Sequence, residues 1–102
     1  MHHEELTLSI LRNITETKTQ QTLASEIGVS VGKVNYVLKA LIEKGFIKAE
    51  NFFANKNKNQ YKYLLTEKGI KEKIALTEKF IERKKKQYDE LVLELEIMKE
   101  RY

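Results

Sequence analysis

Apolar residues recur at helical spacing in three stretches within the first 45 positions of this 102-residue chain. The first stretch ends near Thr15 and has apolar residues on one helical face, at Leu6, Ile10, Leu11 and Ile14. The second runs from Gln20 to Ile27 and is shorter. The third, from about Val31 to Lys44, has apolar residues at i, i+3, i+4, i+7 and i+8, which predicts a buried stripe of Val34, Val37, Leu38, Leu41 and Ile42.

Beyond Gly45 the helical spacing stops and two short stretches of β type follow. Residues 46–53 and 60–65 are rich in aromatic and β-branched side chains, which predicts two strands. Between them lies a polar turn with two lysines, Lys56 and Lys58, and several asparagines. Asparagine tolerates the left-handed backbone conformation of tight turns. We therefore predict a β-hairpin with lysines at its tip.

Capping residues stand where the helices should begin and end. Thr19, Ser30 and Thr66 each precede a predicted helix and offer a hydroxyl to the free N–H groups of its first turn. Gly28 and Gly45 follow the second and third helices, where a left-handed residue commonly ends a helix. Two helices joined by a turn of about three residues that contains glycine have the spacing of a helix-turn-helix.

The last third of the chain is predicted to form one long helix. No helix breaker occurs after Gly69, so about 36 residues, spanning about 54 Å, can be helical. Apolar positions recur there in alternating steps of four and three, which is the a/d seam of a coiled coil, with interruptions at Thr77 and Lys84. The predicted dimerisation residues are Ile70, Ile74, Ile81, Tyr88, Leu91, Leu95 and Met98.

An exposed helix with this apolar stripe implies a partner helix, and the simplest partner is a second copy in a two-fold dimer. Leu76, Phe80 and Leu93 flank the seam and would widen the apolar face near the domain. Basic residues at 83–86 are followed by acidic residues between 89 and 96. Opposite charges offset along the helix fit an antiparallel pairing at least as well as a parallel one, so both arrangements stay open.

The order of these elements predicts a mainly α fold with a small β-hairpin wing. The architecture is a winged helix-turn-helix followed by one long C-terminal coiled-coil helix. Residues 1–66 would form the winged helix-turn-helix DNA-binding domain, and residues 67–102 the dimerisation helix.

Positive charge gathers in the middle of the chain. Residues 29–66 have a net charge of +5, against −2 for residues 1–28 and +1 for residues 67–102. The excess lies on the third helix and the hairpin, which are the parts that a winged helix presents to DNA. The candidate DNA-binding residues are Thr19 and Gln20, then Ser30, Gly32, Lys33, Asn35, Tyr36 and Lys39, and Lys56 and Lys58 in the hairpin turn.

These residue types suit contacts with DNA at the N-terminal end of a recognition helix. Lys33 can reach a guanine edge or a phosphate, and Asn35 can form paired hydrogen bonds with adenine. Tyr36 offers a ring to a thymine methyl group and a hydroxyl to a phosphate. Gly32 has no side chain, so the backbone can approach the duplex closely.

The composition argues against several other classes of function. The absence of cysteine excludes disulfides and thiolate metal sites. No apolar run approaches the ~20 residues of a membrane span, and no signal-peptide pattern is present, so a cytoplasmic chain without membrane contact is expected. His2 and His3 stand alone in the N-terminal tail, so neither a metal site nor a cofactor is expected. We also expect no enzymatic activity.

Three segments resemble MarR-type winged helix-turn-helix regulators: GVSVGKVNY at 28–36, LKALIEKG at 38–45 and YLLTEKGI at 63–70. The likeness is closest to the short EPS-associated members, whose name refers to exopolysaccharide production. It implies sequence-specific binding of double-stranded DNA by a homodimer that regulates transcription. Typical members hold a small molecule where the dimer domain joins the winged helix. Here the first helix is short and the last one single, so such an effector pocket is not expected.

A protein-interaction module is the alternative function. In that case the long helix would pair with a different coiled-coil protein, for which the seam interruptions at Thr77 and Lys84 leave room. Light scattering separates the two, because a stable monomer would favour a different partner.

Overall fold

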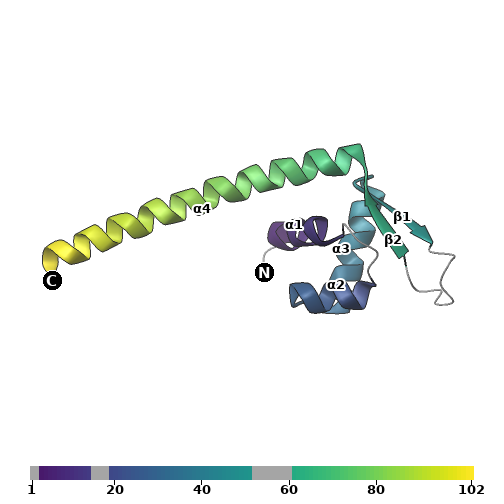
Figure 1. The fold of residues 1–102 in the computed structure, drawn as a ribbon, viewed down its shortest axis with the longest axis horizontal. Coiled ribbons are helices and arrows are strands. Elements are labelled where there is room, and N and C mark those ends of the chain that lie inside the picture. The colour runs from purple at the N-terminus through teal and green to yellow at the C-terminus, as the bar shows by residue number, and fades with distance from the viewer. Residues whose placement is uncertain (1–2, 15–18, 52–60) are drawn as a thin grey trace.

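The structure is a computed structural model that describes residues 3–14, 19–51 and 61–102 (Figure 1). Within these ranges the elements are α1 (His3–Asn13), α2 (Gln20–Ile27), α3 (Val31–Glu43), β1 (Ile47–Asn51), β2 (Tyr61–Leu65) and α4 (Glu67–Arg101). The three short helices pack together beside the hairpin, and α4 passes α1 and then extends away from the domain. The predicted mainly α fold with a small hairpin and a long C-terminal helix is confirmed.

The predicted caps define the helix-turn-helix. The Thr19 hydroxyl accepts a hydrogen bond of 3.0 Å from the backbone N–H of Thr22, which starts α2. The Ser30 hydroxyl accepts one of 3.2 Å from the backbone N–H of Lys33, which starts α3. Between them Gly28 has a φ of +84°, the left-handed conformation expected of it. The chain therefore turns from α2 into α3 within three residues, and the two helices cross at a steep angle (Figure 1).

The two strands form an antiparallel hairpin in which Ile47 lies opposite Leu65 and Ala49 lies opposite Tyr63. Ile47 and Tyr63 are both buried, so one face of the hairpin closes the core. The first strand is described as far as Asn51, whereas the prediction extended it to Phe53. The rest of that prediction lies outside the described residues, together with the hairpin turn and its Lys56 and Lys58.

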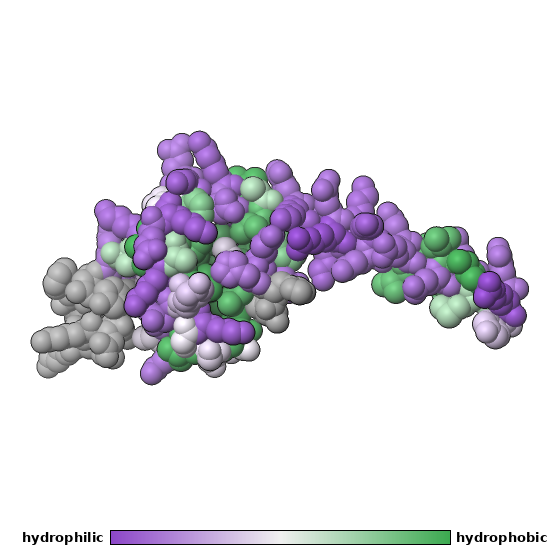
Figure 2. Space-filling view, turned by 180° about the vertical axis from the view of Figure 1, so that it is seen from behind, coloured by the Kyte–Doolittle hydropathy of each residue, from purple (hydrophilic) through white to green (hydrophobic). Residues whose placement is uncertain are grey.

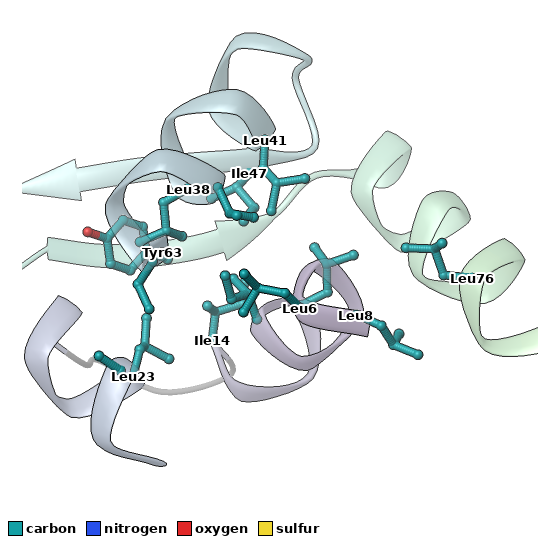
Figure 3. Packing of buried hydrophobic residues seen from close by; sticks show 14 residues of the cluster. Leu6, Leu8, Ile14, Leu23, Leu38, Leu41, Ile47, Tyr63 and Leu76 are labelled. Atoms are coloured by element: carbon teal, nitrogen blue, oxygen red, sulfur yellow. The ribbon is translucent and has the colours of Figure 1, made fainter. Parts of the chain in front are cut away.

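One apolar core joins the three short helices to the hairpin and to the first part of α4 (Figure 3). Its most deeply buried side chains are Ile10, Leu11, Ile14, Leu23, Val34, Leu38 and Ile47. The predicted stripe of α3 is confirmed at Val34, Val37, Leu38 and Leu41 but is wrong at Ile42, which is 38% exposed. Eight residues rotate a helix about 80° past its starting direction, so Ile42 lies at the edge of the stripe.

α1 buries a wider face than its predicted apolar positions, because α4 crosses over it. Thr7 and Leu8 are buried as well, and the Thr7 hydroxyl donates a hydrogen bond of 2.9 Å to the His3 carbonyl. From α4, Leu76 joins the core and Phe80 packs against it, as predicted. The same prediction is wrong for Leu93, which lies beyond the domain and is exposed.

The start of α4 is fixed to the turn that follows α3. The Thr66 hydroxyl donates to the Gly45 carbonyl at 2.5 Å, and the Thr66 backbone N–H donates to the Phe46 carbonyl at 3.1 Å. Gly69 passes so close to this turn that a Cβ atom there would overlap the carbonyl oxygen of Phe46. The direction in which α4 leaves the domain is therefore tied to the end of α3.

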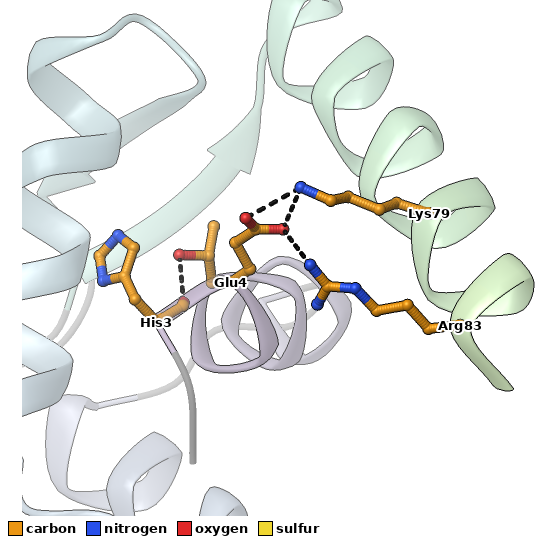
Figure 4. Close-up of polar contacts among 5 residues, drawn as sticks. His3, Glu4, Lys79 and Arg83 are labelled. Atoms are coloured by element: carbon orange, nitrogen blue, oxygen red, sulfur yellow. Dashed lines mark hydrogen bonds and ion pairs between the residues drawn. The ribbon is translucent and has the colours of Figure 1, made fainter. Parts of the chain in front are cut away.

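A second attachment joins α4 to the start of α1 (Figure 4). The Lys79 ammonium lies 2.9 Å from Oε1 and 2.8 Å from Oε2 of Glu4, and the Arg83 guanidinium lies 3.8 Å from Oε2. The hydrogen bond from Lys79 lowers the pKa of Glu4 below its ordinary value of 4.5. The charges of Lys79 and Arg83 act in the same direction, against partial desolvation.

Beyond Arg83, α4 continues as an exposed rod, and the molecule measures 65 Å along its longest axis. Figure 2 shows a hydrophilic stretch of this rod, followed by apolar side chains gathered near its free end. Among the helices that the structure describes, none is both long enough and apolar enough to cross a bilayer.

Candidate nucleic-acid interface

The exposed side of α3 holds most of the predicted DNA-binding residues. Val34, Val37 and Leu38 face the core, so the opposite side of α3 faces outward. Lys33, Tyr36 and Lys39 are exposed, and the Tyr36 side chain is 71% exposed. The structure therefore brings an ammonium group, a phenol and a second ammonium group onto one outward face of α3.

The first turn of α3 is open to the outside. A Cβ atom on Gly32 would meet only the Ser30 hydroxyl oxygen, at 4.0 Å, so nothing in the domain requires glycine at this position. The Ser30 hydroxyl oxygen already accepts the N–H of Lys33, which leaves its hydrogen available to an outside acceptor. Both residues lie where a duplex can reach the backbone.

The candidate residues of α2 lie next to those of α3. The Gln20 side-chain amide donates a hydrogen bond of 3.2 Å to Oδ1 of Asn35, and both residues are half-buried. The Thr19 hydroxyl is engaged by the N–H of Thr22 and lies 2.9 Å from the Thr22 hydroxyl. Sequence reasoning named Gln20 and Asn35 separately but missed their pairing, because periodicity carries no information about a contact between two different helices.

Val31 belongs to this surface although the predicted contact set omits it. It is the first residue of α3 and its side chain is 42% exposed. The buried stripe begins three residues later, at Val34. The sequence signal that could have identified Val31 is an apolar β-branched residue in the first turn, ahead of that stripe. An apolar group here suits contact with a thymine methyl group.

The charges on this side of the domain are unevenly balanced. Within the described part of the chain, Lys33 and Lys39 have no acidic side chain at ion-pair distance. On the hairpin, by contrast, Lys48 lies 3.8 Å from Glu50, whose strand neighbour is Lys62. Between α3 and the described part of the hairpin, the uncompensated positive charge therefore lies mainly on α3.

The predicted dimerisation residues all lie on α4, and their side chains are exposed in the single chain. Exposure ranges from 48% at Ile70 and Leu95 to 67% at Tyr88. An open groove of about 830 Å³ runs beside this seam between α1 and α4. Its lining includes Leu8, Phe80, Ile81 and Arg12. Among the described residues, no group of three or more His, Cys, Asp or Glu side chains is arranged to hold a metal ion.

Comparison with known families matches residues 4–48 to a model described as winged helix-turn-helix DNA-binding. The matched segment begins in α1 and ends in β1, so it contains the whole helix-turn-helix. No curated protein sequence matches the chain.

Solved structures of transcriptional regulators share the fold. A mutant of MepR from Staphylococcus aureus is 23% identical, with a TM-score of 0.68 over 88% of this chain and 66% of its own. BldR from Sulfolobus solfataricus is 19% identical, with a TM-score of 0.72 over 96% of this chain and 74% of its own. The complex of Staphylococcus aureus MepR with DNA is 20% identical, with a TM-score of 0.70 over 84% of this chain and 63% of its own.

The chain spans about two thirds of the length of the MepR chains that it matches. It therefore has the winged-helix fold of these regulators in a shorter form.

Proposed function

We propose that this chain is a transcriptional regulator that binds double-stranded DNA through its winged helix-turn-helix and acts as a homodimer. The observation that carries the proposal is the outward face of α3, where Lys33, Asn35, Tyr36 and Lys39 stand on a helix-turn-helix framework. The fold shared with MepR, which is known in complex with DNA, supports it. The sequence resemblance to EPS-associated MarR-type members makes exopolysaccharide genes the proposed target.

In this proposal the N-terminal half of α3 enters the major groove. Lys33 and Lys39 contact guanine edges or phosphates, and Asn35 pairs with adenine through its side-chain amide. Gly32 lets the backbone approach the duplex, and Val31 and Tyr36 provide apolar contacts to thymine methyl groups. Each bidentate base contact of this kind contributes about 1–3 kcal/mol of discrimination.

Phosphate contacts fix the position of the domain on the duplex. The first turn of α2, with Thr19 and Gln20, would direct its free N–H groups and its positive dipole end at one phosphate. Lys56 and Lys58, which lie outside the described residues, would contact the phosphate backbone as well. Residues 1–66 would thus act as the DNA-binding unit and residues 67–102 as the dimerisation helix.

The test is duplex binding by the full chain at two salt concentrations, using fragments that it retains from random DNA pools. Contacted phosphates release counterions, so affinity should fall steeply as salt rises. Lys33→Ala and Lys39→Ala should each weaken binding and reduce the salt slope by about one. Lys86→Ala, on the exposed rod of α4, is the matched control and should leave binding unchanged. Equal affinity of all four proteins would contradict the proposed surface.

A protein-interaction module is the second candidate, and the observation that favours it is the length of exposed α4 beyond the domain. Its apolar side chains would then pair with a different coiled-coil protein. Light scattering of the purified chain distinguishes the two candidates, because the regulator should be a dimer and the module a monomer.

A further inference from the structure

The seam of α4 and the groove between α1 and α4 are one continuous surface. Thr77, Ile81 and Lys84 are positions of the seam and also line the groove. Towards the free end of the helix the seam continues through exposed Leu91 and Leu95. A helix that covers the seam therefore also lies along the groove.

We infer that the occupant of this surface is the α4 of a second copy, running antiparallel, so that residues whose numbers add up to 172 face each other. This inference rests on the homodimer of the proposed function and adds its orientation and register. The seam has the same alternating spacing of four and three residues when it is read in either direction. In this alignment every a position of one helix therefore lies against a d position of the other. The facing pairs are Ile74 with Met98, Thr77 with Leu95, Ile81 with Leu91, and Lys84 with Tyr88.

The antiparallel register explains the polar interruption of the seam at Lys84. It places Lys84 over the ring of Tyr88 from the second copy, where the ammonium is attracted to the face of the aromatic ring. It also places Thr77 against Leu95. A parallel pairing would instead bury Lys84 against a second Lys84, with their like charges desolvated together.

Charges along the edges of the pair do not reverse this preference. A parallel pairing would gain edge contacts between Lys73 and Glu78 and between Glu94 and Lys99. The antiparallel register instead brings Lys73 level with Lys99 and Lys71 level with Arg101, at exposed positions where water and salt screen the repulsion. Exposed ion pairs of this kind contribute little to stability, because water and salt screen them and the long side chains must be ordered. Two facing lysines in the seam cost more than these pairs return.

The groove is complementary to the segment that the register brings to it. The groove residues of α4, between 73 and 84, are level with residues 88–99 of the second copy, which carry four acidic residues (Asp89, Glu90, Glu94 and Glu96) and one basic residue, Lys99. The groove is lined by three basic residues, Arg12, Lys73 and Lys84, against one acidic residue, Glu5. Leu91 and Leu95 of the second copy would cover its apolar floor, at the level of Ile81 and Thr77.

The register also sets the distance between the two domains. The domain packs on residues 67–83 of α4, whose midpoint, residue 75, is level with residue 97 of the second copy. Twenty-two residues of helix separate these levels by about 33 Å. The register therefore fixes the separation of the two domains along the paired helices, and with it the spacing of the half-sites that the two α3 helices would read.

Disulfide trapping tests the register, since the chain has no native cysteine. Ile81→Cys and Leu91→Cys proteins, mixed and mildly oxidised, should form a mixed cross-link between residues 81 and 91. Each variant alone should form little, because identical positions lie about 15 Å apart along the antiparallel pair, beyond the reach of a disulfide. Leu93→Cys, on the opposite face of α4, is the control for random collision and should not cross-link.

A spin label at Glu100→Cys provides a second readout that needs no oxidation. Its two copies should lie about 42 Å apart in the antiparallel pair and side by side in a parallel one. Cross-links between identical seam positions, a short label distance, equal cross-linking of Leu93→Cys, or a monomer in light scattering would each overturn the register. Duplex binding by the unmodified chain tests the proposed function separately. Binding together with parallel cross-links rejects the register alone, and the expected cross-links without binding reject the proposed function alone.

Discussion

The side-chain amide of Gln20, in the first turn of α2, donates a hydrogen bond of 3.2 Å to Oδ1 of Asn35 on α3. The bond holds the Asn35 side chain at the boundary between the two helices and leaves both of its N–H donors free. It also joins a residue proposed to approach a phosphate to a residue proposed to read a base. Occupation of one site therefore orients the side chain used at the other.

Asn35→Ala is expected to lower the affinity for a selected duplex by about 1–3 kcal/mol and to relax the preference at one base pair. The reason is the loss of a paired donor and acceptor at a base edge. Gln20→Ala keeps the Asn35 amide but leaves it free to rotate. Its effect should therefore be smaller, and it should change the overall affinity more than the base preference. Binding titrations against the selected duplex and its single-base variants measure both. An unchanged base preference in Asn35→Ala would contradict the assigned role.

Gly69, at the start of α4, and Gly32, on the recognition surface, should respond oppositely to alanine. Gly69→Ala should destabilise the domain by about 1–3 kcal/mol, because its Cβ would overlap the Phe46 carbonyl and the backbone would have to shift. Gly32→Ala meets open space at the start of α3, so it should stabilise the fold by about 0.5–1 kcal/mol. Denaturant unfolding of the full chain measures both changes.

The same Gly32→Ala variant also tests the DNA contact. If the backbone at residue 32 approaches the duplex as proposed, the added methyl group should weaken binding by about tenfold, or roughly 1.4 kcal/mol, in a protein that is more stable than the original. A more stable variant with unchanged duplex affinity would show that α3 approaches DNA elsewhere along its length.

Local features of this fold could be predicted from sequence because each depends on neighbours along the chain. The caps at Thr19, Ser30 and Thr66 and the left-handed Gly28 occur at the predicted residues, since a hydroxyl or a missing side chain acts within one turn. Periodicity also identified the α3 stripe, apart from Ile42 at its edge.

Contacts between distant elements could not be predicted in this way. The Glu4 contacts with Lys79 and Arg83 join residues about 75 positions apart, and many lysines in the chain were equally eligible partners. Leu8 is buried because α4 crosses α1, along a path that depends on the close approach of Gly69 to the turn after α3. The candidate DNA surface was predictable as a set of exposed polar residues on α3, but the Gln20 to Asn35 bond was not.

Glu4→Gln should lower the melting temperature near neutral pH by no more than a few degrees, because its partners Lys79 and Arg83 are themselves partly exposed. The pKa of Glu4 is lowered in the folded chain, so its contribution is present above the ordinary value of 4.5 and is lost as the pH falls through the folded value. The difference between original and variant should therefore shrink towards zero in acid. Melting curves at neutral pH and well below pH 4 measure it, with Glu5→Gln on the same turn as control. A difference that persists in acid would mean that the carboxylate charge is not responsible.

Two exposed leucines on α4 distinguish specific pairing through the seam from nonspecific hydrophobic association of the helix. Leu95 and Leu93 are 48% and 58% exposed in the single chain, but two residues of helix separate them by about 200°, so only Leu95 lies on the seam. Leu95→Ala removes two buried side chains from each dimer and should weaken it by about 2 kcal/mol or more, a factor of roughly 30, whereas Leu93→Ala should leave it unchanged. Sedimentation equilibrium measures the dimer dissociation constant of each variant.

Because two linked domains bind adjacent half-sites with a raised effective concentration, Leu95→Ala should also weaken duplex binding at low protein concentration. Equal effects of the two substitutions would contradict the seam, and weaker dimerisation with unchanged duplex binding would mean that the single domain is sufficient for DNA recognition.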